Sequence, residues 1–212
     1  MITFDHIAIA APSLTEGAAY ARNLTGLTFP KGGEHPDMGT HNLLTALGPD
    51  TFAEVIAINP DAPAPNCPRW FGLDNPAEQA KFPCMQAWLL RTDDIDGCIA
   101  KAAELGIDLG RAIPFRRDAL RWRFTITDDG SIPLGGAAPL LLQWDVTSPQ
   151  HPASNMIDLG LRMDALTIET PHAGRLAALL DALDLKDRPA IKQTTNTKIT
   201  AAFSTPNGKP NL

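Results

Sequence analysis

The chain begins with a short strand-like segment, FDHIAIAAP at residues 4–12, which is rich in small and β-branched apolar residues. Pro12 ends this strand, and Ser13 with Glu16 three residues later has the spacing of a helix capping box. A helix is therefore predicted to follow and to end at Gly26. Further strands are predicted near residues 27–31, 40–47 and 51–58. The order is strand, helix, strand, strand, strand.

The same order of elements recurs once later in the chain, and a third copy repeats it in part, with a strand, a helix and two further strands. A strand at 85–90, a helix ending at Gly106 and strands at 107–115, 120–127 and 140–146 form a second copy. A third copy starts with MDALTIETP at 163–171, which matches residues 4–12 at the Asp, the alternating aliphatic residues and the Pro. The predicted organisation is a first module at 1–59, a Pro-rich connector at 60–84, a second module at 85–147 and a third, partial module at 160–212.

Composition excludes several classes of protein. The chain has 212 residues, 44% hydrophobic and 20% charged, with a net charge of −6 and no clustered basic stripe. No apolar run reaches the roughly 18 residues of a membrane-spanning helix, and the acidic balance argues against a nucleic-acid partner. The three cysteines lack a C-x-x-C spacing, so we expect reduced, mostly buried thiols. The sequence predicts a cytoplasmic protein with a small-molecule ligand and no nucleic-acid or membrane partner.

One charged residue stands out in the strand at 51–58. Glu54 is its only charged residue, and burying a lone carboxylate costs several kcal/mol, so it is expected to be paired, metal-bound, protonated or facing a wet cavity. Strand alternation places His6 with Phe4 and Ala8, and Asp5 on the opposite face. Gln143 occupies the place in the second module that Glu54 has in the first. Arg123 is an available ion-pair partner for Glu54 if it faces the same cavity.

The residues around the loop at 34–39 and two tryptophans in the second module also bear on the site. His35, Thr40 and Asn42 are predicted to line the mouth of a cavity, although Gly and Asn are also what a tight turn needs. Trp122 and Trp144 fall on the strand face opposite Arg123 and Gln143, so we expect them to pack against helices. The sequence contains no phosphate-binding loop, dinucleotide fingerprint or Gly-x-Ser-x-Gly elbow.

The motifs resemble a known family. GGEHPDMGTHN at 32–42, Trp122-Arg123, QWD at 143–145 and His151-Pro152 are similar, in order and spacing, to the glyoxalase-like domain family. That family lies within the vicinal oxygen chelate superfamily of glyoxalases, bleomycin-resistance proteins and extradiol dioxygenases. The resemblance implies an α+β fold in which repeated βαβββ modules form an open barrel of curved sheet, with a third, partial module at the C-terminus.

The resemblance also implies a metal centre on the concave face. His6, Glu54 and Gln143 fall on positions that resemble metal ligands, and the divalent ion would be Zn, Mn, Ni or Fe. The position equivalent to His6 in the second module is Ala87, which cannot coordinate a metal. His35 or His41 could complete the set from the loop.

Two functions follow, from different classes. The first is a metal-assisted lyase or isomerase acting on a small carbonyl or enediolate metabolite, with Glu54 or His35 moving a proton. The substrate would contact Thr40, Asn42, Arg123 and Gln143. Dioxygenase chemistry would need a second His ligand. The alternative is a metal-free binding protein of the bleomycin-resistance type, in which Glu54 and Arg123 satisfy each other. The third module is predicted either to close a sheet edge or to form a homodimer contact.

Overall fold

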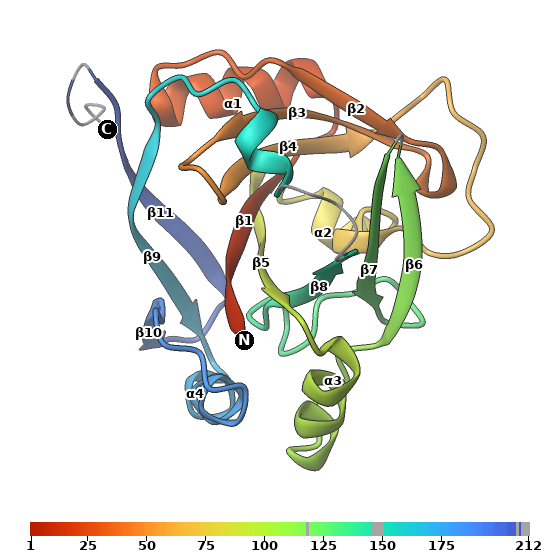
Figure 1. Ribbon diagram of the computed structural model, residues 1–212, viewed down its shortest axis with the longest axis vertical. Coiled ribbons are helices and arrows are strands. Elements are labelled where there is room, and N and C mark those ends of the chain that lie inside the picture. The colour runs from red at the N-terminus through yellow and green to blue at the C-terminus, as the bar shows by residue number, and fades with distance from the viewer. Residues whose placement is uncertain (118, 146–150, 207, 209–212) are drawn as a thin grey trace.

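The computed structural model describes residues 1–212 except 118, 146–150, 207 and 209–212. The fold is α+β, as the sequence predicts. Eight strands form one curled sheet in the order β2-β3-β4-β1-β5-β8-β7-β6, and three strands form a second sheet in the order β10-β9-β11. Figure 1 shows the large sheet wrapped around a concave interior, with α1 and α3 on its outer side.

The first half of the large sheet follows the predicted order. Its elements are β1 (Ile2–Ala10), α1 (Leu14–Thr25), β2 (Lys31–His35), the short η1 turn (Pro36–Met38), β3 (Thr40–Ala46) and β4 (Phe52–Ile58). The Ser13 side chain accepts a hydrogen bond from the Glu16 backbone N–H at 3.2 Å. Gly26 ends α1 in the left-handed conformation, with a φ of 73°. Both predicted helix boundaries therefore have the expected physical cause.

The second half repeats the arrangement. Its elements are β5 (Cys84–Thr92), α3 (Ile95–Glu104), β6 (Arg111–Arg117), β7 (Leu120–Ile126) and β8 (Leu140–Trp144). Asp94 caps α3 by accepting the Gly97 N–H at 3.0 Å. β1 and β5 pair antiparallel and join the two halves into one sheet, whose edges are β2 and β6. The curl brings these two edge strands toward each other (Figure 1).

The third segment packs on the outer side of the large sheet. Its elements are β9 (Arg162–Thr170), α4 (Ala173–Ala182), β10 (Ala190–Gln193) and β11 (Lys198–Ser204). Ile168 and Leu179 share one apolar core with Ile7 of β1 and Trp88 of β5. Among the described strands, the second sheet is not hydrogen-bonded to the first, so this segment covers the convex face and does not extend an edge. A dimer contact through it remains a prediction.

The connector contributes side chains to the concave side. It contains η2 (Trp70–Gly72) and α2 (Pro76–Gln79), and a short η3 turn (Pro152–Asn155) lies near the same side from later in the chain. Trp70 and Phe71 are buried in the second apolar core, together with Leu89 and Leu142. Phe71 has a φ of 60°, a strained conformation for a bulky residue, and its carbonyl accepts the Gln86 amide at 3.0 Å. No pattern in the sequence predicts this insertion.

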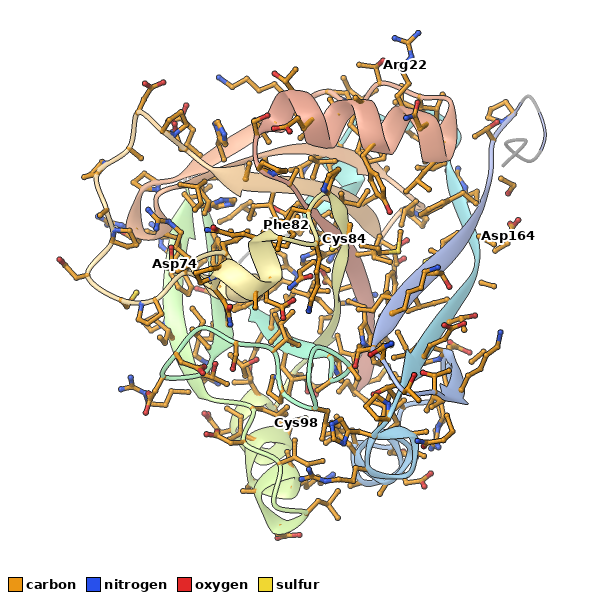
Figure 2. All side chains as sticks on the ribbon, turned by 180° about the vertical axis from the view of Figure 1, so that it is seen from behind. Arg22, Asp74, Phe82, Cys84, Cys98 and Asp164 are labelled. Carbon is orange, nitrogen blue, oxygen red and sulfur yellow. The ribbon has the colours of Figure 1, made fainter. Side chains whose placement is uncertain are left out.

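The cysteines are free thiols, as expected, but the expectation that most of them are buried is wrong, because only one of the three is. Cys98 is buried in α3, Cys84 is half-buried at the start of β5 and Cys67 is exposed in the connector. Figure 2 labels Cys84 and Cys98 in separate parts of the molecule. Within the described residues, no helix is both long and apolar enough to cross a membrane.

Candidate functional site

A narrow cavity lies inside the curl of the large sheet. The space that the centre of a water molecule can reach is about 50 Å³, enough for a few waters or a small ligand. Its polar lining residues are His6, His35, Asn42, Glu54 and Arg117. Its aromatic lining residues are Phe52, Trp70, Phe71, Trp122, Phe124 and Trp144. An apolar cavity with a few converging polar groups is the usual form of a small-molecule site.

Four of the predicted site residues line this cavity, and three of them lie side by side. β1 and β4 are parallel neighbours, which brings His6 Nε2 to 3.7 Å from Glu54 Oε2. Asn42 on β3 donates from Nδ2 to Glu54 Oε1 at 2.6 Å, and its Oδ1 accepts the Gly33 N–H at 2.7 Å. The neighbours of the buried Glu54 carboxylate are therefore the Asn42 amide and the His6 imidazole, and not an arginine or lysine. The predicted ion pair between Glu54 and Arg123 does not form.

Asp5 is the residue that sequence reasoning placed on the wrong face. The pairing of β1 with β5 shifts register between Phe4 and His6, and such a bulge adds a residue that breaks the alternation of faces. Asp5 therefore reaches the same side as His6, and its Oδ1 accepts from His6 Nδ1 at 2.6 Å. The sequence signal that could have revealed this arrangement is the pair of adjacent polar residues, Asp5 and His6, in an otherwise apolar strand.

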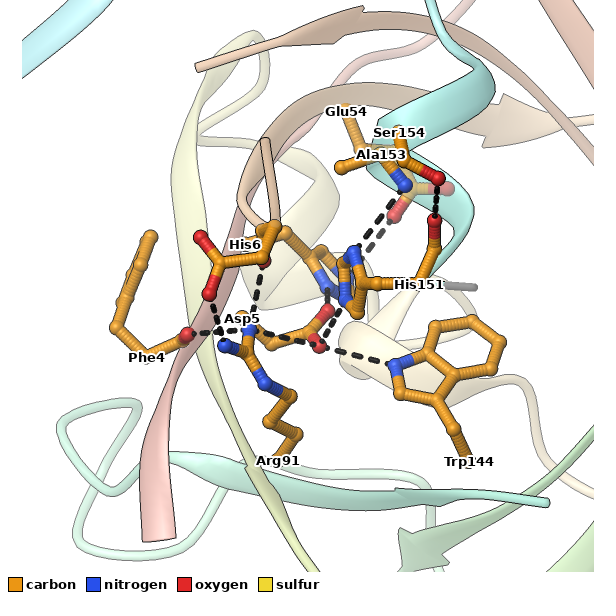
Figure 3. A network of polar contacts seen from close by, with 10 residues as sticks. Phe4, Asp5, His6, Glu54, Arg91, Trp144, His151, Ala153 and Ser154 are labelled. Atoms are coloured by element: carbon orange, nitrogen blue, oxygen red, sulfur yellow. Dashed lines mark hydrogen bonds and ion pairs between the residues drawn. The ribbon is translucent and has the colours of Figure 1, made fainter. Parts of the chain in front are cut away.

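Asp5 is the centre of a buried polar network (Figure 3). Its side chain is fully buried. His151 Nε2 and Trp144 Nε1 donate to Asp5 Oδ2 at 2.8 and 3.0 Å, and Arg91 lies 3.7 Å from the same oxygen. Burial opposes the charge, but the hydrogen bonds from His151 and His6 outweigh it and hold the Asp5 pKa well below its usual value. Asp5 is therefore a buried carboxylate anion.

The network fixes which ring nitrogen of each imidazole carries a hydrogen. Because ionised Asp5 only accepts hydrogen bonds, Nδ1 of His6 carries the proton and a neutral His6 keeps its lone pair on Nε2. His6 Nε2 is the atom that faces Glu54. In His151, Nδ1 accepts the Ala153 N–H at 3.2 Å, so Nε2 carries the proton that it donates to Asp5. His6 is also stacked on Phe52, with ring centroids 4.2 Å apart.

His35 lies at the other end of the cavity. Its Nδ1 is 3.0 Å from Thr40 Oγ1, and its Nε2 is 3.3 Å from the Arg117 guanidinium. Burial, with Arg117 beside it, lowers the His35 pKa to about 3. His35 is therefore neutral, with Nε2 accepting from Arg117. Thr40 is buried behind His35, and Arg117 is a site residue that sequence reasoning missed.

Gln143 and Arg123 lie on the outer face of the sheet, away from His6 and Glu54. Gln143 Oε1 accepts the Ile95 N–H at the start of α3 and the Arg123 guanidinium, both at 3.0 Å. Arg123 also pairs with Asp96 of α3 at 2.7 Å. The prediction that Gln143 and Arg123 share one face of β7 and β8 is correct, but that face turns outward and not toward the cavity. Trp122 and Trp144 line the cavity instead of packing against helices.

The residues present do not fit the metal centre that the resemblance implies. His6 and Glu54 face each other, but Gln143 is on the other side of the sheet. Ala87 lies on β5 directly opposite Ala8 of β1 and offers no donor atom. Within the described part of the chain, no cluster of three or more His, Cys, Asp or Glu residues could hold a metal ion. Two donors fall short of the three protein ligands typical of catalytic zinc sites.

The comparisons with known proteins agree with the fold. The sequence matches a family model described as a glyoxalase-like domain over residues 4–183, and no curated protein matches it. A hypothetical protein from Staphylococcus aureus is similar in structure, with a TM-score of 0.61 and 15% identity over 97% of this chain and 91% of that chain. Methylmalonyl-CoA epimerase from Mycobacterium tuberculosis has a TM-score of 0.42 and 19% identity over 66% of this chain and 85% of its own.

A further similar structure is a variant of Streptomyces coelicolor methylmalonyl-CoA epimerase in complex with 2-nitronate-propionyl-CoA. Its TM-score is 0.41, with 16% identity over 66% of this chain and 95% of that chain. At these identities, the likeness to solved structures concerns the fold alone. The family match spans most of the 212 residues and confirms the resemblance found in the motifs. This chain therefore belongs to the glyoxalase-like domain family.

Proposed function

We propose that this protein is a lyase or isomerase that moves a proton on a small oxygen-bearing molecule, with His6 as the base. The observation that carries the proposal is the buried pair of Asp5 and His6, in which His6 lines the cavity. A carboxylate that accepts a hydrogen bond from Nδ1–H orients an imidazole and leaves Nε2 as the basic atom. Titratable groups arranged in this way in a cavity are typical of catalytic sites.

The proton transfer uses atoms that the chain itself supplies. His6 Nε2 takes a proton from a carbon next to a carbonyl, and the electron pair of that C–H bond forms an enolate. Ionised Asp5 stabilises the resulting imidazolium. Glu54 Oε2 lies 3.7 Å from His6 Nε2 and lines the same cavity. In an isomerase, the imidazolium gives this proton to the neighbouring carbon while the hydroxyl proton of the enediol passes to the other oxygen. In a lyase, the enolate expels a leaving group with its bonding electrons, and the imidazolium protonates that group.

Hydrogen-bond donors are present for the enolate oxygen. Arg117 lines the cavity, and the buried indole N–H of Trp70 has no hydrogen-bond partner among the described residues. A buried donor without a partner costs free energy, so a substrate oxygen that accepts from it gains that amount on binding. Preorganised donors of this kind stabilise developing negative charge.

Solvent exchange at carbon tests the proposal across a range of candidate substrates. The protein is incubated in D₂O with a panel of small α-hydroxy carbonyl and 1,2-dicarbonyl compounds, and proton NMR follows the exchange. We expect exchange of at least one compound, and its loss in His6→Gln. His172→Gln, a change of the same kind on the third module, is the matched control and keeps full exchange. A wild-type protein that exchanges none of the panel, or a His6→Gln variant that keeps the rate, would refute the proposal.

The second candidate is a metal-free binding protein. It is favoured by the aromatic walls of the cavity and by the hydrogen bond that already satisfies Glu54 through Asn42. It predicts that a compound from the same panel raises the unfolding temperature without any exchange at carbon. Exchange catalysed by wild type and lost in His6→Gln decides against it.

A further inference from the structure

A second, open groove adjoins the cavity where the two edges of the curled sheet approach each other. We call it the seam groove. One wall is β2 with the following turn, residues 31–34 and Pro36, and the other is formed by Arg116, Arg117 and Arg121 of the β6–β7 hairpin. Figure 1 shows β2 arriving beside the upper ends of β6 and β7. The seam is tight at one point, because a Cβ added to Gly33 would lie 2.9 Å from Arg117 Nη1.

The seam groove is basic in a protein with a net charge of −6. Its described lining has four cations and one anion, Glu34, which lies 4.0 Å from Lys31 in an exposed pair. Exposed pairs of this kind contribute little and exchange readily with solvent ions. Asp118 lies outside the described residues. A concentration of one sign of charge in a concave surface attracts ligands of the opposite sign.

Arg117 links the groove to the cavity. It lines both, and its hydrogen bond goes to the neutral ring of His35 at 3.3 Å. Among the described residues, no carboxylate lies within ion-pair distance of Arg117, although the residue is half-buried. Arginine that leaves water is normally paired with an anion. A planar guanidinium in this position can hold an oxyanion through two parallel hydrogen bonds.

We infer that the seam groove binds an oxyanion, a carboxylate or a phosphate, carried by the small molecule whose reacting carbon lies in the cavity beside His6. The inference rests on the proposed function and narrows its substrate class to anionic carbonyl compounds. Arg117 holds the anionic group where groove and cavity meet, and Arg116, Arg121 and Lys31 add the long-range attraction. The fixed anion holds the substrate in one orientation, which directs the carbonyl end to the cavity.

Anion binding is measured on the whole protein by tryptophan fluorescence, because Trp70, Trp122 and Trp144 line the cavity. The probes are inorganic phosphate and acetate, with neutral acetamide for comparison, all at constant ionic strength. We expect saturable binding of at least one anion and none of acetamide. The two anion arms decide which oxyanion the groove prefers. Arg117→Gln weakens binding by roughly 10- to 100-fold, the loss of a charge-assisted guanidinium bond.

The matched control is Arg123→Gln, which removes the same charge from the outer face of β7 and leaves anion binding unchanged. Arg117→Lys keeps the charge and restores part of the affinity, so a folding defect in Arg117→Gln cannot mimic the result. Absence of anion binding in wild type, or equal affinity in the Arg117→Gln and Arg123→Gln variants, overturns the inference.

The same titration separates this inference from the proposed function. His6→Gln keeps anion binding, because the anion site does not include His6. Anion binding by a protein that exchanges no carbon-bound proton refutes the proposed function and leaves the anion site standing. Exchange by a protein that binds neither anion refutes the anion site alone.

Discussion

Asp5→Asn is the most informative single change. The side chain keeps its shape but loses its charge, and three ring N–H groups donate to it in the folded protein. A charge-assisted hydrogen bond exceeds a neutral one by roughly 1 kcal/mol, so the variant is expected to lose about 3 kcal/mol of unfolding free energy. For a chain of this size that is a fall in midpoint temperature of about 6–12 °C.

The amide also changes the His6 tautomer. If Oδ1 of the new side chain keeps the donors His151 and Trp144, its NH₂ group faces His6 Nδ1, which must then accept. His6 Nε2 becomes protonated and donates toward Glu54 Oε2, so the base of the proposed reaction is lost. Nitrogen NMR of the imidazole rings is expected to show Nδ1–H in wild type and Nε2–H in the variant. Asp5 is thus tested as a positioning residue by a readout that a loss of stability alone does not move.

Urea unfolding followed by circular dichroism at pH 7 measures the stability change. The matched control is Asp50→Asn, which removes an exposed partner of the same Arg91 and is expected to cost less than about 1 kcal/mol. Because the folded pKa of Asp5 lies below its ordinary 3.8, its contribution is present above pH 3.8 and is lost as the pH falls through the lower folded value. Equal losses of unfolding free energy in Asp5→Asn and Asp50→Asn would refute this reasoning. So would a stability difference between wild type and Asp5→Asn that stays the same as the pH is lowered.

Three further outcomes are expected. Burial and Arg117 lower the His35 pKa from 6.5 to about 3, so only the unfolded chain takes up this proton as the pH falls from 6.5. The unfolding free energy of the wild type is therefore expected to fall by about 2 kcal/mol between pH 6.5 and 5. Urea unfolding at the two pH values is expected to show most of that fall removed in His35→Gln. An equal fall in the two proteins would contradict this. Gln143→Leu costs about 1–2 kcal/mol, because the Ile95 N–H at the start of α3 loses its acceptor, yet it leaves anion binding intact; weaker anion binding in this variant would place Gln143 in the site after all. EDTA is expected to change the unfolding temperature by no more than about 1 °C, because the site holds no tightly bound metal, and such a metal would add several kcal/mol of stability. Stoichiometric metal in elemental analysis, lost in His6→Ala, would show instead that the site binds a metal.

The elements themselves were predictable because their causes are local. The capping box at Ser13, the left-handed Gly26 and the cap at Asp94 act within a few residues of sequence. The apolar strands between them carry the repeated strand, helix, strand, strand, strand order. Proximity of His6 and Glu54 was also accessible, because each is the conspicuous polar residue of an apolar strand in the same module.

The second half of the site was not predictable in the same way. Side-chain alternation with a period of two tells which residues share a face, but not which face turns inward. Gln143 and Trp144 are neighbours in β8, and a one-residue difference in assignment exchanges the cavity for the outer surface. Only the packing of α3 on the outer face, through the Ile95 N–H and Gln143, settles the choice.

By itself, then, the sequence determined the α+β modules, their order and the imidazole and carboxylate that face each other, since these depend on short-range patterning. The tertiary structure alone decided the rest. The bulge at Asp5 exists only through the pairing of β1 with β5, and the bond from His151 to Asp5 joins residues 146 positions apart. Trp70 enters the cavity from the connector, and Arg117 crosses to β2 only because the sheet curls. Such contacts have no sequence period, because they depend on how distant segments meet in space.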